Sequence, residues 1–284
     1  MTDLPKISII IPTRNRARYL KRGLDKILES EYPNLEIIVM DGASTDDTVQ
    51  ILKSYGNRIT KWVSERDDGE YYAVNKGLTF ATGEIIKFMS DDDVLLPHSL
   101  DIAGRYFLAN PDVDVVFGQQ KVYLSTPDGD VLVNDKPILD KHSLTPRNWI
   151  RRSIATPSHI ASFVRRRVID EVGNMSTEYW PGDVEFWARV ACHGTRMALL
   201  PDHFVNYYPT GQSGVMTRAR QCQTIFYYTA RLHGDLSDVF YVVFRKLLLF
   251  EILNPIVMAS HAVGFHPLRR RLIKKIQKRK SIEK

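Results

Sequence analysis

Short apolar runs alternate with segments of helical spacing over the first 118 residues. Four runs have the length and β-branched content of buried strands: residues 6–11, 35–41, 61–64 and 84–89. Apolar residues at helical spacing lie between them, at 18–30, at Val49, Ile51 and Leu52, and at 71–81. This alternation predicts an α/β fold, with a mostly parallel central sheet and helices on both faces.

Local signals refine two of these elements. Ser44 and Asp47 stand in capping-box spacing, with Asp where Glu is usual, so we expect Ser44 to cap the second helix. Asp41 and the acidic run 91–93 fall where the second and fourth strands end. Ligands of parallel sheets bind beyond the carboxyl ends of the strands, so these acids are predicted to lie at a binding edge.

The pattern changes in the second half of the chain. Residues 126–130, Thr-Pro-Asp-Gly-Asp, predict a hairpin turn, and residues 147–202 predict a mixed lobe with a helix near 184–193. Residues 239–244 are the longest unbroken apolar run near the C-terminus. A membrane-spanning helix needs about 20 apolar residues, so we expect none in this chain.

Charge is distributed unevenly along the 284 residues. The net charge is +6, but residues 266–284 contain nine Lys/Arg and one acid, which leaves the rest of the chain slightly acidic. We therefore expect no nucleic-acid groove in the body of the protein. Two cysteines without metal or disulfide spacing, and no visible signal peptide, favour a cytoplasmic location.

The basic C-terminal segment has an amphipathic pattern. Leu268, Leu272, Ile273 and Ile276 fall on one helical face, with basic residues around it. Such a helix is typical of proteins that lie on anionic membranes, which would make this protein peripheral at the inner face of the cell membrane. A solvated tail helix, or a contact between subunits of an oligomer, explains the same pattern.

Three consecutive acids, Asp91, Asp92 and Asp93, follow the fourth predicted strand. Adjacent carboxylates repel one another, so a fold that keeps them together needs water, a basic partner or a cation. At the end of a strand they would form an oxygen-rich site for Mg²⁺ or Mn²⁺. A solvated turn is the competing interpretation, because Asp is common in turns.

Eight stretches in a fixed order carry a family resemblance: residues 7–16, 41–48, 64–77, 81–86, 91–93, 163–166, 172–173 and 182–189. Together they resemble the family 2 glycosyltransferases of the GT-A fold, over roughly residues 6–200. The resemblance implies a GT-A domain over 1–214, with a nucleotide-binding half over about 1–118 and an acceptor-binding half over about 119–214. A helical, basic extension would follow over 215–284.

The resemblance implies which residues bind the donor, a nucleotide-diphospho-sugar with UDP as the expected nucleotide. The residues expected to bind it are Pro12, Thr13, Arg14, Asp41, Asp68, Lys76, Asp91 and Asp92. Asp41 can accept a hydrogen bond from the base, or it can cap the turn that follows it. Lys76 can face the nucleotide, or it can be a solvated lysine on a helix.

The resemblance also assigns the acidic run to a divalent cation, Mg²⁺ or Mn²⁺. Asp92, together with Asp93, is expected to bind the ion that bridges the donor diphosphate, and Asp91 is expected to reach the ribose or a metal-bound water. Such an ion stabilises the charge of the departing diphosphate.

The expected general base is Asp183, which would take the proton of the acceptor hydroxyl in an inverting transfer. Many family members have Glu before this Asp, whereas this chain has Gly182. His159, Trp180 and Glu185 are weaker candidates for contact with the acceptor. Each has a structural alternative: a core or surface histidine, a packed tryptophan and a charge at a helix N-terminus.

The predicted function is metal-dependent, inverting sugar transfer to a glycan or lipid-linked acceptor, in surface polysaccharide or lipopolysaccharide synthesis. A nucleotidyltransferase that makes activated sugars is one alternative, but residues 12–15 lack the glycine that its phosphate loop requires. A sugar-binding domain without activity is another, and it predicts loss of the acids that this chain retains.

Overall fold

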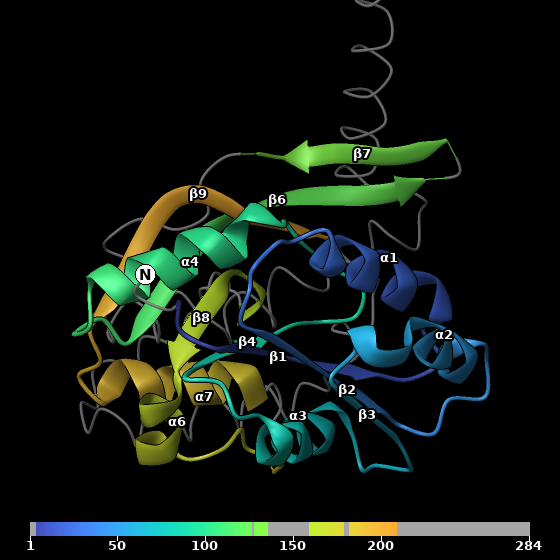
Figure 1. Ribbon diagram of the computed structural model, residues 1–284, viewed down its shortest axis with the longest axis horizontal. Coiled ribbons are helices and arrows are strands. Elements are labelled where there is room, and N and C mark those ends of the chain that lie inside the picture. Colours follow the sequence, from blue (N-terminus) through green and yellow to red (C-terminus); the bar gives the residue numbers. More distant parts are fainter. Residues whose placement is uncertain (1–3, 127, 136–158, 179–181, 209–284) are drawn as a thin grey trace, which may run out of the picture.

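The computed structural model describes residues 4–126, 128–135, 159–178 and 182–208 (Figure 1). The described strands are β1 Ile7–Thr13, β2 Leu35–Asp41, β3 Lys61–Ser64, β4 Ile85–Phe88, β5 Val94–Leu95, β6 Val115–Thr126, β7 Gly129–Asn134, β8 Ser162–Arg165 and β9 Met197–Tyr207. The described helices are α1 Ala17–Leu28, α2 Thr48–Tyr55, α3 Glu70–Phe80, α4 His98–Ala109, α6 Arg166–Val172 and α7 Gly182–Cys192, with short 3₁₀ turns at Gly56–Arg58 and His159–Ala161.

The described strands form one sheet in the order β3-β2-β1-β4-β8-β6-β9-β5, and β7 extends β6 as a hairpin. The first four strands in this order are parallel, and β8 runs antiparallel between β4 and β6. Strand order reverses direction along the chain between β1 and β4, which are parallel neighbours. The crevice at such a reversal is where open α/β sheets bind ligands.

Helices cover both faces of the sheet, as Figure 1 shows. One core cluster packs α1, α2 and α4 against the strand residues Ile7, Ile9 and Ile11, among others. The other packs α3, α6 and α7 against the opposite faces of the same strands, including Ile10 and Ile38. Alternate residues of each strand thus enter different cores, which explains why these strands are apolar throughout.

The predicted mixed α/β fold with a mostly parallel sheet and helices on both faces is confirmed. The second and third strands have the predicted bounds, and the first and fourth differ from prediction by one or two residues at each end. The hairpin turn at 126–130 joins β6 to β7. The boundary predicted at 214/215 and the extension 215–284 lie outside the described residues. Among the described helices, none has the length and apolarity needed to cross a bilayer.

The capping-box prediction is wrong. The Ser44 hydroxyl donates to Asp41 at the end of β2, and the N-cap of α2 is Asp47, whose side chain makes no capping hydrogen bond. Asp46 instead accepts hydrogen bonds from the Thr48 N–H and hydroxyl, the former at 3.0 Å. The Ser44 oxygen, which a cap would use as acceptor, instead accepts from the Asn15 N–H at 2.7 Å.

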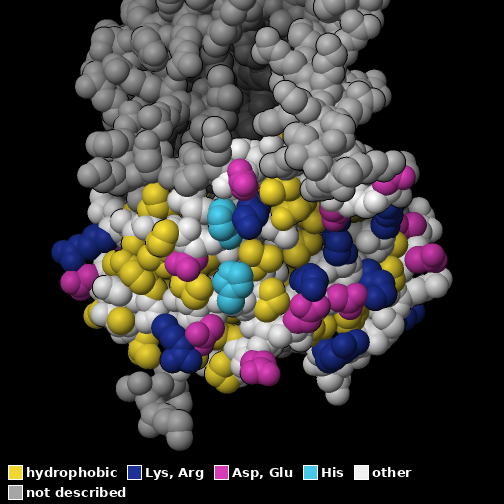
Figure 2. All heavy atoms as spheres, turned by 90° about the horizontal axis from the view of Figure 1, so that it is seen from above, with side chains coloured by type: hydrophobic (Ala, Val, Ile, Leu, Met, Phe, Trp, Pro, Cys, Tyr) yellow, Lys and Arg dark blue, Asp and Glu magenta, His cyan; other side chains and the backbone are white. Residues whose placement is uncertain are grey.

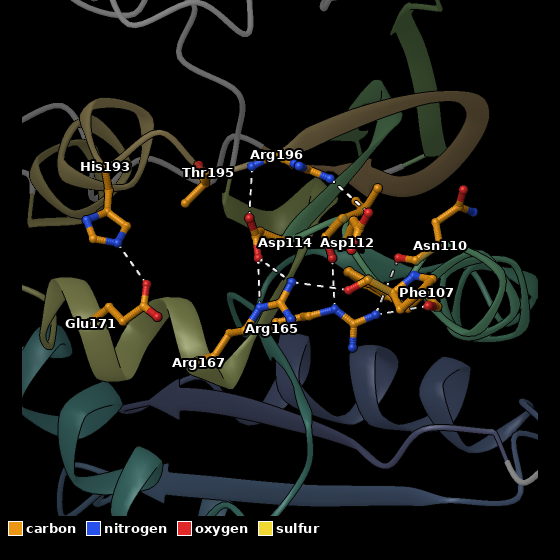
Figure 3. Close-up of polar contacts among 12 residues, drawn as sticks. Phe107, Asn110, Asp112, Asp114, Arg165, Arg167, Glu171, His193, Thr195 and Arg196 are labelled. Atoms are coloured by element: carbon orange, nitrogen blue, oxygen red, sulfur yellow. Dashed lines mark hydrogen bonds and ion pairs between the residues drawn. The ribbon is translucent and has the colours of Figure 1, made fainter.

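A polar network closes the amino end of the parallel strands (Figure 3). Arg165 is 7% exposed and donates to the carbonyl oxygens of Val113 at 2.8 Å and Phe107 at 2.9 Å. Asp114 accepts from Arg167 Nε at 2.9 Å and from the Arg196 N–H at 2.9 Å. Because these charges meet opposite charges or carbonyl dipoles, this end of the sheet is electrostatically satisfied.

The surface seen in Figure 2 carries mixed charges. Basic and acidic side chains lie interspersed on the described part of that face, between patches of apolar side chains. Helical ion pairs such as Lys21–Asp25 at 2.7 Å and Arg105–Asp101 at 2.7 Å are of this kind. Exposed pairs of this type contribute little to stability.

Candidate active site

The acidic run lies at the carboxyl end of β4, beside the end of β1. The Thr13 hydroxyl donates to Asp91 Oδ2 at 2.7 Å, and Thr13 is the β1 residue that pairs with Asp41 in register. The structure therefore brings the predicted residues Thr13, Asp41 and Asp91 to one edge of the sheet. This is the edge at which the strand order reverses, as the sequence predicted.

Arg16 joins the first two carboxylates of the run. Its Nε lies 3.2 Å from Asp91 Oδ1, and its Nη2 lies 2.6 Å from Asp92 Oδ2. Sequence analysis assigned no role to Arg16, although it closes the first motif, residues 7–16. The signal that could have found it is a basic residue following the strand whose end faces the acids.

Burial acts strongly on these acids. It raises the pKa of Asp91 to about 6, and the charge of Asp92 adds to this, whereas Thr13 and Arg16 oppose it. Burial also raises the pKa of Asp93 well above its usual range. Low-dielectric surroundings and neighbouring carboxylates both favour the protonated form, so the run is poised to accept positive charge.

Asp93 is buried and bonded to the backbone. Its carboxylate is 1% exposed and accepts a hydrogen bond from the Tyr208 N–H at 2.8 Å, where β9 has just ended. The exposed fraction of the Asp92 side chain is 15%. This geometry argues against Asp93 as a metal ligand, because it holds the β9 terminus instead, and it favours Asp92.

The backbone of the acidic run packs directly on α1. A methyl group in place of the Gly23 hydrogen would lie 3.2 Å from the Asp93 carbonyl oxygen. Arg22 Nη2 donates to the Asp92 carbonyl oxygen at 2.7 Å, and the Arg22 guanidinium lies 3.7 Å from the centre of the Tyr208 ring. These contacts from α1 and β9 fix the position of the run.

A pocket of about 260 Å³ opens beside this edge. It is lined by Met40, Asp41, Glu65, Arg66, Asp67, Asp68, Tyr72, Ala73 and Lys76. The lining comes from the end of β2, the loop that follows β3, and α3. Three predicted donor residues, Asp41, Asp68 and Lys76, thus share one concave site, in which polar groups can fix the orientation of a small molecule.

Asp41 also has the structural role that sequence analysis left open. It accepts hydrogen bonds from the Ser44 N–H at 3.0 Å and from the Ser64 hydroxyl at 2.5 Å. Gly42 follows in a crowded position, where a methyl group would meet the Asp67 carboxylate and the Arg14 side chain. Asp41 is therefore held rigidly in the pocket wall.

Other predicted donor residues differ in exposure. Lys76 forms an ion pair with Glu65, another pocket residue, and both side chains are about half exposed. Asp68 and Arg14 are exposed, whereas Pro12 is buried within β1. Glu65 and Tyr72 were not singled out by sequence analysis, although both belong to the motif at 64–77.

Asp183 lies in the first turn of α7 and is partly buried. The Tyr71 hydroxyl donates to Asp183 Oδ1 at 2.9 Å, which connects α7 to the helix that lines the pocket. One turn further along α7, the Phe186 ring packs edge-on against Phe88, the last residue of β4, at 5.7 Å between ring centres. The start of α7 therefore lies beside the strand that carries the acidic run.

The remaining acceptor candidates are Glu185, Trp180 and His159. Glu185 is 3% exposed, and its carboxylate oxygens each accept from Arg189 at 2.7 Å. This geometry argues against its predicted contact with an acceptor, because Arg189 uses the pair to hold the carbonyl oxygens of residues 172–174. Trp180 and the side chain of His159 lie outside the described part of the chain.

The residues at the acidic run fit a divalent cation. Asp91 and Asp92 present hard oxygen donors, and they already hold a cationic group, the Arg16 guanidinium, between them. Within the described residues no cluster of three or more His, Cys, Asp or Glu side chains forms a complete ligand set. Mg²⁺ usually completes its shell with substrate phosphates and water, so two carboxylates are sufficient protein ligands.

The chain is similar in sequence to glycosyltransferases. An uncharacterized glycosyltransferase of Methanocaldococcus jannaschii is 24% identical over 267 residues, which cover 89% of this chain and 91% of that protein. The GalNAc(5)-diNAcBac-PP-undecaprenol beta-1,3-glucosyltransferase of Campylobacter jejuni is 39% identical over 119 residues, 40% of this chain and 38% of that protein.

Solved structures show the same fold. S. aureus TarS 1-349 in complex with UDP-GlcNAc superimposes with a TM-score of 0.65 at 19% identity, covering 87% of this chain and 73% of that chain. The mannosyltransferase PcManGT from Pyrobaculum calidifontis, in complex with GDP-Man and Mn²⁺, gives 0.57 at 22% identity, covering 97% and 81%. The family model "Glycosyl transferase family 2" matches residues 8–173, more than half of the chain, and the protein therefore belongs to the family 2 glycosyltransferases.

Proposed function

We propose that this glycosyltransferase uses a nucleotide-diphospho-sugar, with UDP as the nucleotide, and a divalent cation, and that it inverts the configuration of the sugar. The proposal rests on the residues that lie together at one edge of the sheet. There a polar pocket, the carboxylates of Asp91 and Asp92, and the start of α7 with Asp183 lie on neighbouring elements.

The donor would bind with its nucleoside in the pocket between Asp41 and Lys76 and its diphosphate at the acidic run. Pro12 and Thr13 end β1 beside the pocket, Arg14 follows them, and Asp68 lies on the pocket wall. Arg16 would release Asp92 when a cation arrives and could then face the phosphates, because a guanidinium binds either partner. The relatives crystallised with UDP-GlcNAc and with GDP-Man support a nucleotide-sugar donor.

Asp92, with Asp91, would hold Mg²⁺ or Mn²⁺. When bound, this ion would supply Lewis-acid stabilisation of the charge on the departing diphosphate. The raised pKa of Asp91, caused mainly by burial, favours such a partner, because a cation relieves the repulsion between adjacent carboxylates. The described pair Asp91–Asp92 and its bound guanidinium support this assignment.

Asp183 would act as the general base. Its carboxylate is partly exposed at the N-terminus of α7, where it can accept the proton of an acceptor hydroxyl as the new glycosidic bond forms. Attack from the face opposite the diphosphate would invert the anomeric centre.

The acceptor would be a glycan or a lipid-linked glycan in surface polysaccharide or lipopolysaccharide synthesis, with the protein peripheral at the inner face of the cell membrane. The name of the Campylobacter jejuni relative, a glucosyltransferase acting on an undecaprenol-linked glycan, supports a lipid-linked acceptor. The basic segment 266–284 supports contact with an anionic surface.

Release of nucleoside diphosphate tests the proposal. UDP-glucose, UDP-GlcNAc and GDP-mannose would each be incubated with the protein, with Mn²⁺ or with EDTA. We expect release from at least one UDP-sugar, with Mn²⁺ only, and a loss of about 100-fold or more in Asp183→Asn. Equal release in EDTA would remove the metal from the proposal, and an unaffected Asp183→Asn variant would remove the base.

A further inference from the structure

Helix α3 contacts the segment that carries the proposed base. Tyr71, in its first turn, is 8% exposed and donates its hydroxyl hydrogen to Asp183 Oδ1 at 2.9 Å. A tyrosine hydroxyl and a carboxylate form a strong hydrogen bond only while the tyrosine is protonated and the carboxylate is ionised. This contact therefore selects the form of Asp183 that can accept a proton.

The Tyr71 hydroxyl keeps its proton under ordinary conditions. Burial, followed by the charges of Asp183 and Glu70, raises the pKa of Tyr71 well above its usual value. Because its hydroxyl stays protonated, Tyr71 acts as a hydrogen-bond donor toward Asp183 throughout the neutral range. Glu185, two residues after Asp183, is paired with Arg189 at 2.7 Å.

A second contact from α3 holds the chain ahead of α7. The Asn75 side chain donates to the Met175 carbonyl oxygen at 2.8 Å and accepts from the Met175 N–H at 3.1 Å. A side-chain amide that satisfies both groups of one peptide residue fixes that residue in two directions. Tyr71 and Asn75, one helical turn apart on α3, thus contact Asp183 and Met175 respectively.

Gly182 explains how Asp183 comes so close to Tyr71. A methyl group at position 182 would lie 2.9 Å from the Tyr71 ring and would also collide with the Ser176 carbonyl oxygen. The Tyr71 ring therefore occupies the space into which a side chain at 182 would extend. Glycine at this position is a requirement of the Tyr71 contact.

The same helix lines the pocket. Tyr72, Ala73 and Lys76 form part of the pocket wall, and they alternate along α3 with Tyr71 and Asn75, which contact Asp183 and Met175. One rigid helix therefore connects the proposed nucleoside site to the proposed base, and a displacement of one would move the other.

We propose that Tyr71 is a positioning residue that orients and keeps ionised the Asp183 carboxylate, and that α3 sets the position of this base relative to the donor pocket. This inference rests on the proposed function, because it assigns Tyr71 a role only through Asp183. Its chemistry requires no group beyond the two side chains and the acceptor hydroxyl.

The test is the pH profile of UDP release from the UDP-sugar that the wild-type protein uses, with Mn²⁺, for Tyr71→Phe. We expect kcat to fall about 10- to 100-fold, the loss typical of one hydrogen bond to a charged group. The acid limb of the profile should move up by about one pH unit, because a carboxylate that loses a donor holds its proton more tightly. KM for the UDP-sugar should stay within about twofold, since Tyr71 does not line the pocket.

Tyr55→Phe is the matched control. The Tyr55 hydroxyl donates to Asp25 at 2.8 Å, so this variant loses the same kind of hydrogen bond on α2, away from the pocket. It should leave both kcat and the pH profile unchanged. A Tyr71→Phe profile that overlies the wild-type profile would overturn the inference, whereas a fully active Asp183→Asn variant would instead overturn the proposed base.

A double-mutant cycle on thermal unfolding supplies a readout that does not depend on turnover. Tyr71→Phe, Asp183→Ala and the double variant would be compared by Tm, because Asn at 183 could still accept the Tyr71 hydrogen bond. If the hydroxyl acts on Asp183, the two Tm changes should be non-additive, because the second substitution removes a contact already lost. Additive changes would show that the side chains are uncoupled and would overturn the inference.

Discussion

Charged side chains have different surroundings at the two ends of the parallel strands. At the amino end, Arg165 and Asp114 meet carbonyl oxygens or opposite charges within the fold (Figure 3). At the carboxyl end, three acids follow one another, and burial raises the pKa of two of them, Asp91 and Asp93. The first arrangement stabilises the fold, whereas the second costs stability that a bound cation would restore.

Charged groups that stabilise the fold and charged groups that serve a function therefore differ in what surrounds them. An ionised group whose partners are supplied by the fold contributes to stability, and its loss leaves buried groups without partners. A group held among like charges lowers stability and is retained because its function requires the charge. Substitutions at the two ends should therefore have opposite consequences for stability and activity.

The largest effect is expected at Asp92. Asp92→Asn should reduce nucleoside diphosphate release with Mn²⁺ by about 1,000-fold, because the neutral amide is a poor ligand for a hard cation. Its Tm without metal should change little, because loss of the ion pair with Arg16 Nη2 at 2.6 Å offsets the relief of repulsion within the acidic run. The matched control is Asp114→Asn at the amino end, which should lower Tm and leave the rate per folded molecule intact. Equal loss of rate in both variants would contradict the comparison.

A large loss of stability is expected at the other end. Arg165→Met should lower the free energy of unfolding by about 3 kcal/mol, because the carbonyl oxygens of Phe107 and Val113 lose their buried donor. Urea denaturation would measure this change. Arg167→Met serves as the control, because the Arg167 side chain is half exposed, and it should cost less than about 1 kcal/mol. A similar cost in both variants would show that the buried contacts are not decisive.

A smaller effect concerns pH. The pKa of Asp91, raised by burial from 3.8 to about 6, means that the folded chain binds more protons than the unfolded chain between these values. Stability from this group is therefore present at low pH and is lost as pH rises through this window. Without metal, the Tm of Asp91→Asn relative to wild type should be higher at about pH 7.5 than at about pH 5, by the equivalent of about 1 kcal/mol. A constant difference would contradict the proposed burial effect.

The smallest effects come from exposed ion pairs, one at each end. Lys76→Met should raise the Kd for UDP about 3- to 10-fold through the loss of a pocket cation, and it should change stability by less than about 0.5 kcal/mol. Arg196 pairs with Asp112 at 2.9 Å, and its side chain is more exposed than that of Lys76. Arg196→Met should leave both quantities unchanged. Titration calorimetry would compare them, and an unaffected Kd in Lys76→Met would restore its interpretation as a solvated lysine.

The sequence alone determined the fold class and the edge at which the chemistry lies. The apolar runs, their spacing and the acids that follow 35–41 and 84–89 indicate a parallel sheet with a polar carboxyl end, because strand periodicity and turn chemistry are local properties. The motif order indicated the family. Side-chain partners were less predictable, as Ser44 shows, because a capping signal in sequence does not reveal that the Ser44 hydroxyl donates to Asp41, three residues earlier at the end of β2.

Tertiary structure decided which partner binds each acid of the run 91–93. Asp92 and Asp93 are adjacent in sequence, yet one is bound by Arg16 and the other by the Tyr208 backbone, since neighbouring residues point in different directions. The contacts Tyr71–Asp183 and Arg16–Asp91 join residues 112 and 75 positions apart. Such pairings arise only when the sheet and both helical layers assemble, because no local preference encodes them.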